Sequence, residues 1–533
     1  MLVPKIILNF YYARAEEEKS QIRGIYNDVL KLTDPFTTIS DSGKQRLGSR
    51  RQIDSAIVDA IDAITSFIMD SIMSRTGKWC EFILDKKKIN EENLDNQSSN
   101  LDDVEKFLQE DTDKVFSYIQ SSNYFKEISR AVKSFVRVGT GAYAIRATGS
   151  NAIPFIYQYI GLDNLFILED NLSRPNIVFK KHPELNASKI KDLFGADAKL
   201  PSGLSEDEPK TTVDVMEVVI PNYDEETAKT TFYYMVMDDK FDFTIKEMEM
   251  EYNPFVVFRW DVIEGNSWGT SAVINNYDII EDLETYKEIF KKQAKRKANP
   301  AGIFYGNEAL FYSLDFEEGK MNYGGDPKLE GEQMANYQVL DDAGNLMPLD
   351  KVIAECRSSF RQALMVDDLV AGTMSQGKDV TATFVAYKQE LFRKRFSATY
   401  ELINSELLEP TFKAPFTIML EQELLNTTDE ILKVTQIRYI NALSKASDMA
   451  EVNKIMDYAG ILGRLEQAKQ IGITLNYPKT TAEIANLIGM KKELIPTEEE
   501  LEQIQQMKLQ QLQQGMGGMI PNETAVSAST TEG

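Results

Sequence analysis

The chain has 533 residues, a length that predicts about two to four domains. Apolar residues make up 43% of it and charged residues 27%, as in folded globular proteins, and it has no run of about 18 apolar residues that could cross a membrane. The formal net charge of −24 excludes a protein whose whole surface grips nucleic acid, because such surfaces are basic. The first residues, MLVPKIILNFYYARAEEEK, become charged too early for a signal peptide, so we expect a protein made and kept in a cytoplasm.

Cysteine and histidine limit the chemistry that the chain can perform. Cys80 and Cys356 each lie in a helical-looking apolar pattern, which predicts buried free thiols rather than a disulfide. His182 is the single histidine, so Cys/His zinc sites are excluded and only one candidate base for a catalytic triad remains. It stands in FKKHPEL, before a proline and beside two lysines, and we therefore predict a surface turn there.

Helical periodicity dominates the first part of the chain. The helices are expected at 15–33, 52–75 and 104–138. The first stops at Asp34, because the proline that follows disfavours helix at the preceding residue. The last stops at the glycines of GTGAY, Gly139 and Gly141. The polar segment 86–103 is predicted to be a loop.

Residues 142–260 form a different region, built of short stretches rich in Val, Ile, Phe and Tyr such as FIYQYI, VDVMEVVI and TFYYMVM. Turn residues separate these stretches, which predicts a mostly antiparallel β region. No helices of βαβ length alternate with them, so a doubly wound nucleotide-binding fold is not expected.

The segment 271–300 reads as one long helix, capped at Ser271 and ended by Asn299 and Pro300. Such a helix spans roughly 40 Å at about 1.5 Å per residue. Its first half is acidic and its second half is basic. The basic residues are Lys291, Lys292, Lys295, Arg296 and Lys297. These bases are possible nucleic-acid contacts, although the helix dipole alone favours cations at a carboxyl end.

The remainder is predicted to be largely helical. A β/turn insertion at 301–348 precedes a helix at 349–370, and a further helix at 380–409 stops at Pro410. A helical region covers 428–490, and a capping box at Thr497 opens a glutamine-rich helix. Residues after Gly515 are low in complexity, and we expect disorder there.

The loop between the last two long helices contains GTMSQGKD, which misses the phosphate-binding pattern G-x-x-x-x-G-K-[ST] by one residue. Asp379 replaces the hydroxyl that binds magnesium, and a helix rather than a strand enters the loop. Small residues instead let the chain turn between two helices, and Asp379 suits the start of the second one. A plain linker and a nucleotide site remain the alternatives to a functional loop.

The order of these parts resembles the portal, or head-to-tail connector, of short-tailed bacteriophages. VRVGTGAYAIRA and LDNLFILEDNLSRPNIVFKKHPEL resemble the glycine turn and hairpin of that family's wing. NPFVVFRWDVIEGNSWGTSAV resembles the approach to its stem helix, with Arg259, Trp260, Gly265, Trp268 and Gly269 in order. The early stretch YNDVLKLTDPF and the later KDVTATFVAYKQELFRKRF, with Thr381, Ala382 and Thr383, are also similar. The similarity extends over about residues 10–420.

The resemblance implies an α+β portal fold that assembles as a ring. Its parts are a β-rich and helical wing at 1–270 to which 380–424 return, stem helices at 271–299 and 349–370, a small α/β clip at 300–348, a tunnel loop at 371–379, a helical crown at 425–514, and a disordered tail at 515–533. The tunnel-loop residues expected to face a DNA channel are Gly372, Thr373, Met374, Ser375, Gln376, Gly377 and Lys378.

The function implied by the resemblance is structural. A ring of copies, twelve if the family pattern applies, would sit at one capsid vertex of a virion assembled in the bacterial cytoplasm. Double-stranded DNA would pass through it during packaging and ejection. Implied partners are the major capsid and scaffolding proteins, the terminase large subunit and a tail adaptor; no membrane, cofactor, metal or catalytic residue is implied. Two alternatives stay open, a P-loop-like nucleotide-binding enzyme and an intracellular helical scaffold.

Overall fold

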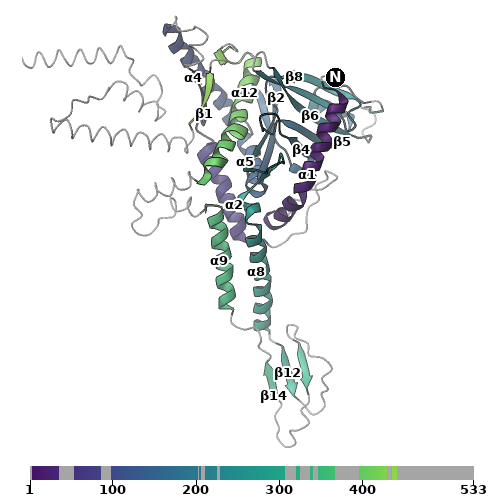
Figure 1. Ribbon diagram of the computed structural model, residues 1–533, viewed down its shortest axis with the longest axis vertical. Helices are drawn as coiled ribbons and strands as arrows, with labels where there is room; N and C mark the ends of the chain where they lie inside the picture. Colours follow the sequence, from purple (N-terminus) through teal and green to yellow (C-terminus); the bar gives the residue numbers. More distant parts are fainter. Residues whose placement is uncertain are drawn as a thin grey trace, which may run out of the picture. The chain divides into compact units, whose positions relative to one another are not determined.

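The computed structural model describes residues 3–34, 53–85, 98–201, 203–205, 210–224, 229–299, 301–305, 320–324, 336–339, 346–366, 395–428, 431–432 and 435–440. The chain divides into two compact units, Met1–Tyr439 and Ile440–Gly533. The architecture below is that of the first unit, in which helices and strands are mixed (Figure 1).

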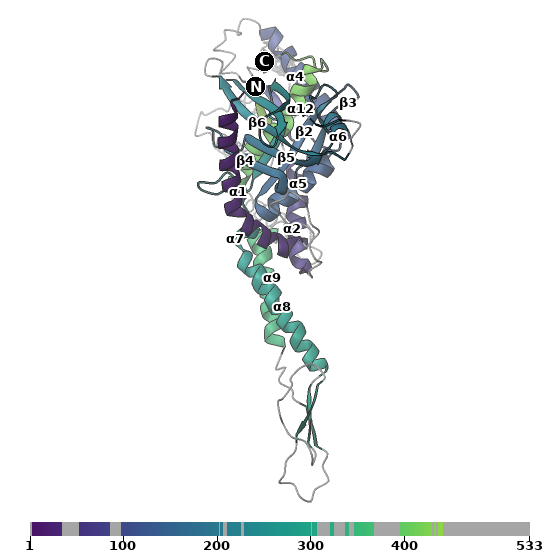
Figure 2. The same cartoon turned by 90° about the vertical axis from the view of Figure 1, so that its right-hand side faces the viewer.

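A five-stranded antiparallel sheet with the order β4-β5-β6-β7-β8 lies beside the first helix (Figures 1 and 2). The elements are α1 (Lys5–Thr33), β4 (Leu165–Leu168), β5 (Ile177–Leu185), β6 (Val213–Asp224), β7 (Lys229–Asp238) and β8 (Thr244–Met250). Alternate residues of the central strands, including Phe179, Val218 and Met235, form one core with Leu8 and Ala15 of α1. Successive side chains of a strand point to opposite faces, so the intervening residues lie on the other face of the sheet.

A second antiparallel sheet has the order β3-β2-β9. Its strands are β2 (Thr140–Ser150), β3 (Ile153–Tyr159) and β9 (Phe255–Arg259). The 3-10 turn η3 (Leu162–Asn164) follows β3 and leads to β4, and α6 (Ala187–Phe194) connects β5 to β6 within the larger sheet. The helix α5 (Tyr124–Val138) packs on β2 and β3. Its buried face includes Ile128, Val132 and Phe135, at the three- and four-residue spacing of an amphipathic helix.

Helices from distant parts of the sequence meet around an aromatic core. They are α2 (Ser55–Phe67), the π-helical turn η1 (Ile68–Ile72), α4 (Ser98–Ser121), the π-helical turn η4 (Ile403–Leu408) and α12 (Glu409–Glu421). Phe116 of α4 stacks on Phe412 of α12 with 5.4 Å between ring centroids, and Trp79 lies edge-on to Phe116 at 5.1 Å. A two-stranded sheet pairs β1 (Cys80–Leu84) with β15 (Thr435–Tyr439), which joins strands that lie about 350 residues apart in the sequence.

A pair of helices, α8 (Tyr277–Ala298) and α9 (Met347–Ala363), lies side by side (Figures 1 and 2). The short hairpin β10 (Asp261–Val262) and β11 (Gly269–Thr270) and the single turn α7 (Ala272–Asn275) precede α8. Between α8 and α9 in the sequence stand three short strands, β12 (Gly302–Tyr305), β13 (Met321–Gly324) and β14 (Asn336–Val339). β12 is central, parallel to β13 and antiparallel to β14.

The antiparallel β region is confirmed by the pairings of β2 to β9, and the helix end at Asp34 is confirmed as well. The first helix, however, begins at Lys5 rather than at residue 15. Ile6 and Phe10 in its first turns are 82% and 62% exposed, so apolar residues occupy the outward face and hide the amphipathic period. The polar residues 98–103, predicted to be a loop, belong to α4.

The helix predicted over 271–300 is divided at Asn276, whose backbone is not helical. The Asn276 side chain donates to the carbonyl of Ala272 at 2.7 Å, a local bond that competes with the helix ladder. The next predicted helix begins at Met347 and ends at Ala363, since Met365 has a φ of 58°; residues 367–370 lie outside the described residues.

The predicted stop at Pro410 is wrong, because helix continues to Glu421. Pro410 falls in the first turn of α12, directly after the π-helical turn, where the missing N–H costs little. The helical region predicted from 428 is wrong for Thr435–Tyr439, which form β15, and the remaining residues from 441 lie outside the described part.

The surface turn predicted for His182 is also wrong, since it lies within β5 with a side chain that is 11% exposed. Cys80 is a buried free thiol as expected, whereas Cys356 on α9 is only partly buried. Burial raises the pKa of the Cys80 thiol well above its usual value, which keeps it protonated and unreactive.

Candidate functional site

The paired helices α8 and α9 are the part of the fold whose charge pattern points to a function. Ile280 and Leu283 of α8 are buried, as are Ile353 and Phe360 of α9. These positions recur at helical spacing, so each helix buries one apolar stripe. The rest of each helix is exposed or half-buried and mostly polar.

The entry to α8 is set by Ser271. Its hydroxyl accepts a hydrogen bond from the Ile274 backbone N–H at 3.2 Å and donates one to the carbonyl of Arg137 at 2.9 Å. The first bond caps the helical turn α7, as the sequence predicts, and the second joins that cap to the end of α5. The start of the helix pair is therefore fastened to the body of the unit.

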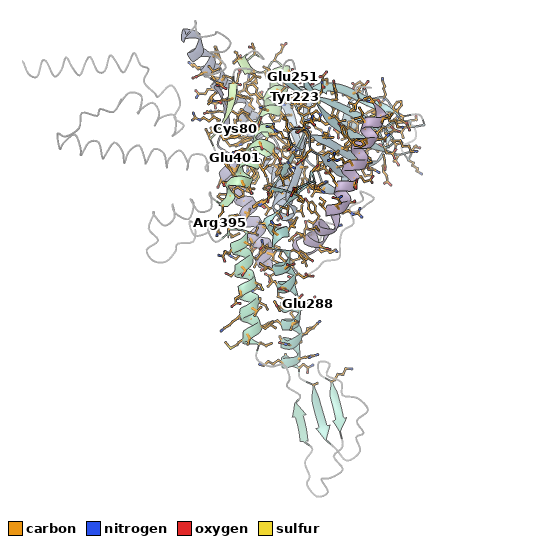
Figure 3. The ribbon with its side chains drawn as sticks, viewed as in Figure 1. Cys80, Tyr223, Glu251, Glu288, Arg395 and Glu401 are labelled. Atoms are coloured by element: carbon orange, nitrogen blue, oxygen red, sulfur yellow. The ribbon has the colours of Figure 1, made fainter. Side chains whose placement is uncertain are left out.

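The basic end of α8 is exposed. All five bases, Lys291, Lys292, Lys295, Arg296 and Lys297, are exposed, and the last three fall in the final helical turn. Glu288, labelled in Figure 3, lies just before them, and a shallow groove of about 440 Å³ runs past it. The groove is lined by Glu288, Phe290, Lys291, Lys292, Ala294 and Lys295. Apolar and cationic side chains thus both line this groove.

An ionic network joins the acidic end of α8 to α9 and α2. The Asp54 carboxylate, in a residue that is 1% exposed, accepts from Arg357 of α9 at 2.8 Å and pairs with Lys287 of α8 at 3.1 Å. It also caps α2 through the Ala56 N–H at 2.8 Å, while the Asp54 N–H donates to Glu284 at 2.9 Å. Burial would raise the pKa of Asp54, but these hydrogen bonds hold it below its usual value.

A crowded glycine turn adjoins the start of α7. Gly139 has a φ of 81°, and a Cβ there would lie 2.3 Å from the Thr270 carbonyl carbon. A Cβ on Gly269 would in turn lie 2.2 Å from the Gly139 oxygen. The two backbones can approach only because both residues lack a side chain, which gives a physical reason for the glycines in GTGAY and NSWGT.

Arg259 is the central contact of the segment that leads to α8. The residue is 1% exposed, and its guanidinium bonds Glu406 of η4 at 2.5 Å and also Glu169. It further donates to the Ser173 carbonyl at 3.0 Å, so one side chain joins β9, the turn after β4 and the π-helical turn. Burial lowers the pKa of Arg259, but the hydrogen bonds that it donates to Glu406 and Glu169, and the charges of these carboxylates, raise it above its usual value.

Several of these residues were not foreseen. The sequence offers one indication that Glu406 is paired, because it is an acidic residue in the apolar stretch INSELLEP. A charged residue on the buried face of a helix needs a partner. Asp54 falls inside the helix predicted over 52–75, and nothing in the sequence marks its ion pairs with residues 287 and 357. The predicted tunnel-loop residues 372–378 all lie outside the described residues, so their role stays a prediction.

Within the described ranges, no group of three or more His, Cys, Asp and Glu side chains is placed to hold a metal ion. In the same part of the chain, no helix combines the length and apolar character needed to cross a membrane.

Comparison with known proteins decides the family. The model of the family described as "Bacteriophage head to tail connecting protein" matches residues 8–495, nearly the whole chain. The chain belongs to this family of bacteriophage head-to-tail connecting proteins. Among curated proteins, a "Probable portal protein" of Bordetella phage BPP-1 is 20% identical over 377 residues, which cover 68% of this chain and 67% of the relative. The expected family is thus confirmed, and with it a structural role in a phage virion.

Two further similarities are more limited. "Guanylate-binding protein 6" of Mus musculus is 24% identical over 204 residues, but the match covers 37% of this chain and 32% of that protein. A chain from a solved structure titled "Virion of native gene transfer agent (GTA) particle" aligns with 82% of this chain and 90% of its own length, at 10% identity and a TM-score of 0.35.

Proposed function

We propose that the chain is a portal subunit that assembles with copies of itself into a ring, twelve if the family pattern applies, at one capsid vertex. Double-stranded DNA passes through the ring during packaging and ejection. The observation that carries the proposal is the α8–α9 pair in a head-to-tail connecting protein. The pair buries one apolar stripe per helix and leaves long polar faces outside. Such faces suit side-by-side packing in a heterologous interface, which closes into a ring.

Charge supports a sliding channel rather than a tight DNA-binding surface. A net charge of −24 repels phosphate backbones from most of the surface. The five bases of α8 concentrate positive charge at one helix end, where a ring of copies would form a basic collar. In this proposal that collar and Lys378 of the tunnel loop contact passing DNA weakly. The remaining parts keep the roles given above: wing 1–270, clip 300–348, crown 425–514 and tail 515–533.

The partners follow from this position. The ring contacts the major capsid and scaffolding proteins during assembly, then the terminase large subunit, and finally the tail adaptor. ATP hydrolysis belongs to the terminase, so the chain itself acts without catalytic residues or cofactors. Assembly in the bacterial cytoplasm precedes incorporation into the virion.

Negative-stain microscopy of the purified full chain, combined with light scattering, tests the ring. We expect particles with a central hole and a mass of many subunits. Monomers or dimers alone, at all protein concentrations tried, would contradict the proposal. Absence of the protein from purified phage particles would instead favour an intracellular scaffold.

The tunnel loop is tested separately. Deleting residues 372–377 should leave rings intact but reduce DNA packaging or retention, because the loop serves the channel and not the fold. If the deletion abolishes folding, the segment is a structural hinge. Calorimetry with ATP and GTP tests the remaining alternative: nucleotide binding that Lys378→Ala removes would establish a P-loop-like site.

A further inference from the structure

A buried cluster of charged side chains occupies the face of the five-stranded sheet opposite α1. Lys180 and His182 of β5, Glu217 of β6 and Tyr234 of β7 share this face, since Lys180 lies directly across from Glu217 in the strand pairing. Arg146 of β2 reaches the same point from the three-stranded sheet. The proposed portal function uses none of these residues.

Glu217 is the centre of the cluster and is fully buried. Its two carboxylate oxygens accept a bidentate pair of bonds from Arg146, both at 2.9 Å. The Tyr234 hydroxyl donates to one oxygen at 2.7 Å, and Nε2 of His182 lies 2.8 Å from the other. Glu217 can only accept while ionised, so Nε2 must carry the proton, and His182 needs no charge to make this bond.

Lys180 makes the balance of charge unusual. Its Nζ lies 4.0 Å from Glu217 and 6.0 Å from the centre of the Phe255 ring. Within the described part of the chain this buried Nζ has no hydrogen-bond partner. Arg146 and protonated Lys180 therefore already place two cations beside one carboxylate, at a site where Lys180 is 7% exposed.

A third cation at this site is unfavourable, and the surroundings of His182 show why. Burial lowers the pKa of His182, as do the charges of Lys180 and Arg146, against the opposing hydrogen bond to Glu217. The ring also packs edge-on against Phe194 of α6 with 5.6 Å between centroids, which limits the room for water around a charged imidazole. Burial lowers the pKa of Lys180 to about 8.

We propose that the cluster is a proton-operated joint between β2 and the five-stranded sheet, in which protonation of His182 adds a third cation beside Glu217 and loosens the contact with Arg146. Glu217 of β6 contacts His182 and Lys180 of β5, Arg146 of β2 and Tyr234 of β7. The charges of Glu217, Lys180 and Arg146 act on His182. Neutral His182 closes the joint, and charged His182 opens it. This inference does not rest on ring assembly or DNA passage.

The sign of the effect follows from linkage. The pKa of His182 is lower in the folded chain than the ordinary value of about 6.5, so the unfolded chain binds more protons as pH falls below that value. The folded chain therefore loses stability as pH falls from about 6.5 to the folded pKa of His182. The lowered pKa of Lys180 acts at higher pH, and the folded chain gains stability as pH rises above about 8.

The single histidine of the sequence makes a direct test possible, because a histidine-specific label reports His182 alone. NMR of the full chain labelled with ¹³C at histidine Cε1 gives the pKa of His182 by titration. We expect a midpoint below about 6.5, the ordinary value. Lys180→Met should move the midpoint upward by removing a like charge. Lys181→Met is the matched control, since Lys181 is 29% exposed and pairs with Asp214 instead, and it should leave the midpoint unchanged.

Thermal unfolding tests the joint itself. The Tm of the unmodified chain should fall more steeply between pH 7 and pH 5 than that of His182→Gln, whose amide donates to Glu217 without titrating. A midpoint at or above about 6.5 would overturn the proposal. So would equal shifts in the two lysine variants, or parallel curves of Tm against pH for the unmodified chain and the glutamine variant.

Discussion

Substitution of Gly139 by alanine tests the close backbone approach that precedes α7. Two separate costs follow from the structure. A φ of 81° costs an alanine about 1–2 kcal/mol, because the left-handed region places Cβ against the backbone. The added Cβ would also stand 2.3 Å from the carbonyl carbon and 2.4 Å from the oxygen of Thr270, distances that force backbone to move. Backbone shifts caused by overpacking cost roughly 1–3 kcal/mol, so we expect a total loss of about 2–5 kcal/mol.

Gly149 provides a matched control for this substitution. Its φ is 71°, but a Cβ there meets nothing within 4 Å. Gly149→Ala therefore carries the conformational cost of about 1–2 kcal/mol without the clash. The difference between the two variants isolates the steric contact at Thr270.

Urea unfolding followed by tryptophan fluorescence is the assay. The chain has three tryptophans. The backbone N–H of Trp260 donates to the Gly139 carbonyl at 2.9 Å. Trp268 lies edge-on to Tyr26, and the Tyr26 hydroxyl hydrogen-bonds Thr140, the residue after that glycine. The signal therefore reports this region. Equal midpoints for the Gly139 and Gly149 variants would refute the reasoning, because they would mean that the Thr270 contact is relieved without cost.

Three further predictions concern buried contacts. Glu406→Gln leaves Arg259 without its buried carboxylate partner and should cost about 3–5 kcal/mol. Glu169→Gln, at a side chain that is 30% exposed, should cost clearly less, and denaturant midpoints compare the two. Asp54→Asn should make the stability of the fold depend less on pH in acid. The lowered pKa of the Asp54 carboxyl gives stability that is present above about pH 3.9 and is lost as pH falls through the folded pKa. A pH series of Tm for both chains checks this. Phe412→Ala removes a fully buried ring from the aromatic core and should lower stability by about 3–5 kcal/mol, measured in the same way, and a loss below about 1 kcal/mol would contradict its central place there.

Some elements could be predicted from short stretches of sequence because their determinants are local. Ser271 caps the turn of α7, and helix ends directly before Asn299, since caps and breakers act within a few residues. The stretch VDVMEVVI, rich in β-branched residues, forms β6 for the same reason. The order of these elements also carried the family resemblance, which the match to residues 8–495 confirms.

Other features escaped prediction because the local signal was absent or misleading. The exposed Ile6 and Phe10 concealed the start of α1, and Pro410 indicated a stop that a preceding π-helical turn removes. His182 looked like a surface residue among lysines until its strand placed it against Glu217. For His182 the deciding contact comes from another strand.

The sequence by itself determined the antiparallel β region, the helix ends at Thr33, Val138 and Ala298 and, through the order of parts, membership of the head-to-tail connecting proteins. Only the tertiary structure decided which charges are buried together. Arg259 and Glu406 are separated by 147 residues, and Asp54 and Arg357 by 303. No propensity or spacing rule joins residues so far apart. Such pairs exist because a buried charge needs a partner, and folding brings the partner within reach.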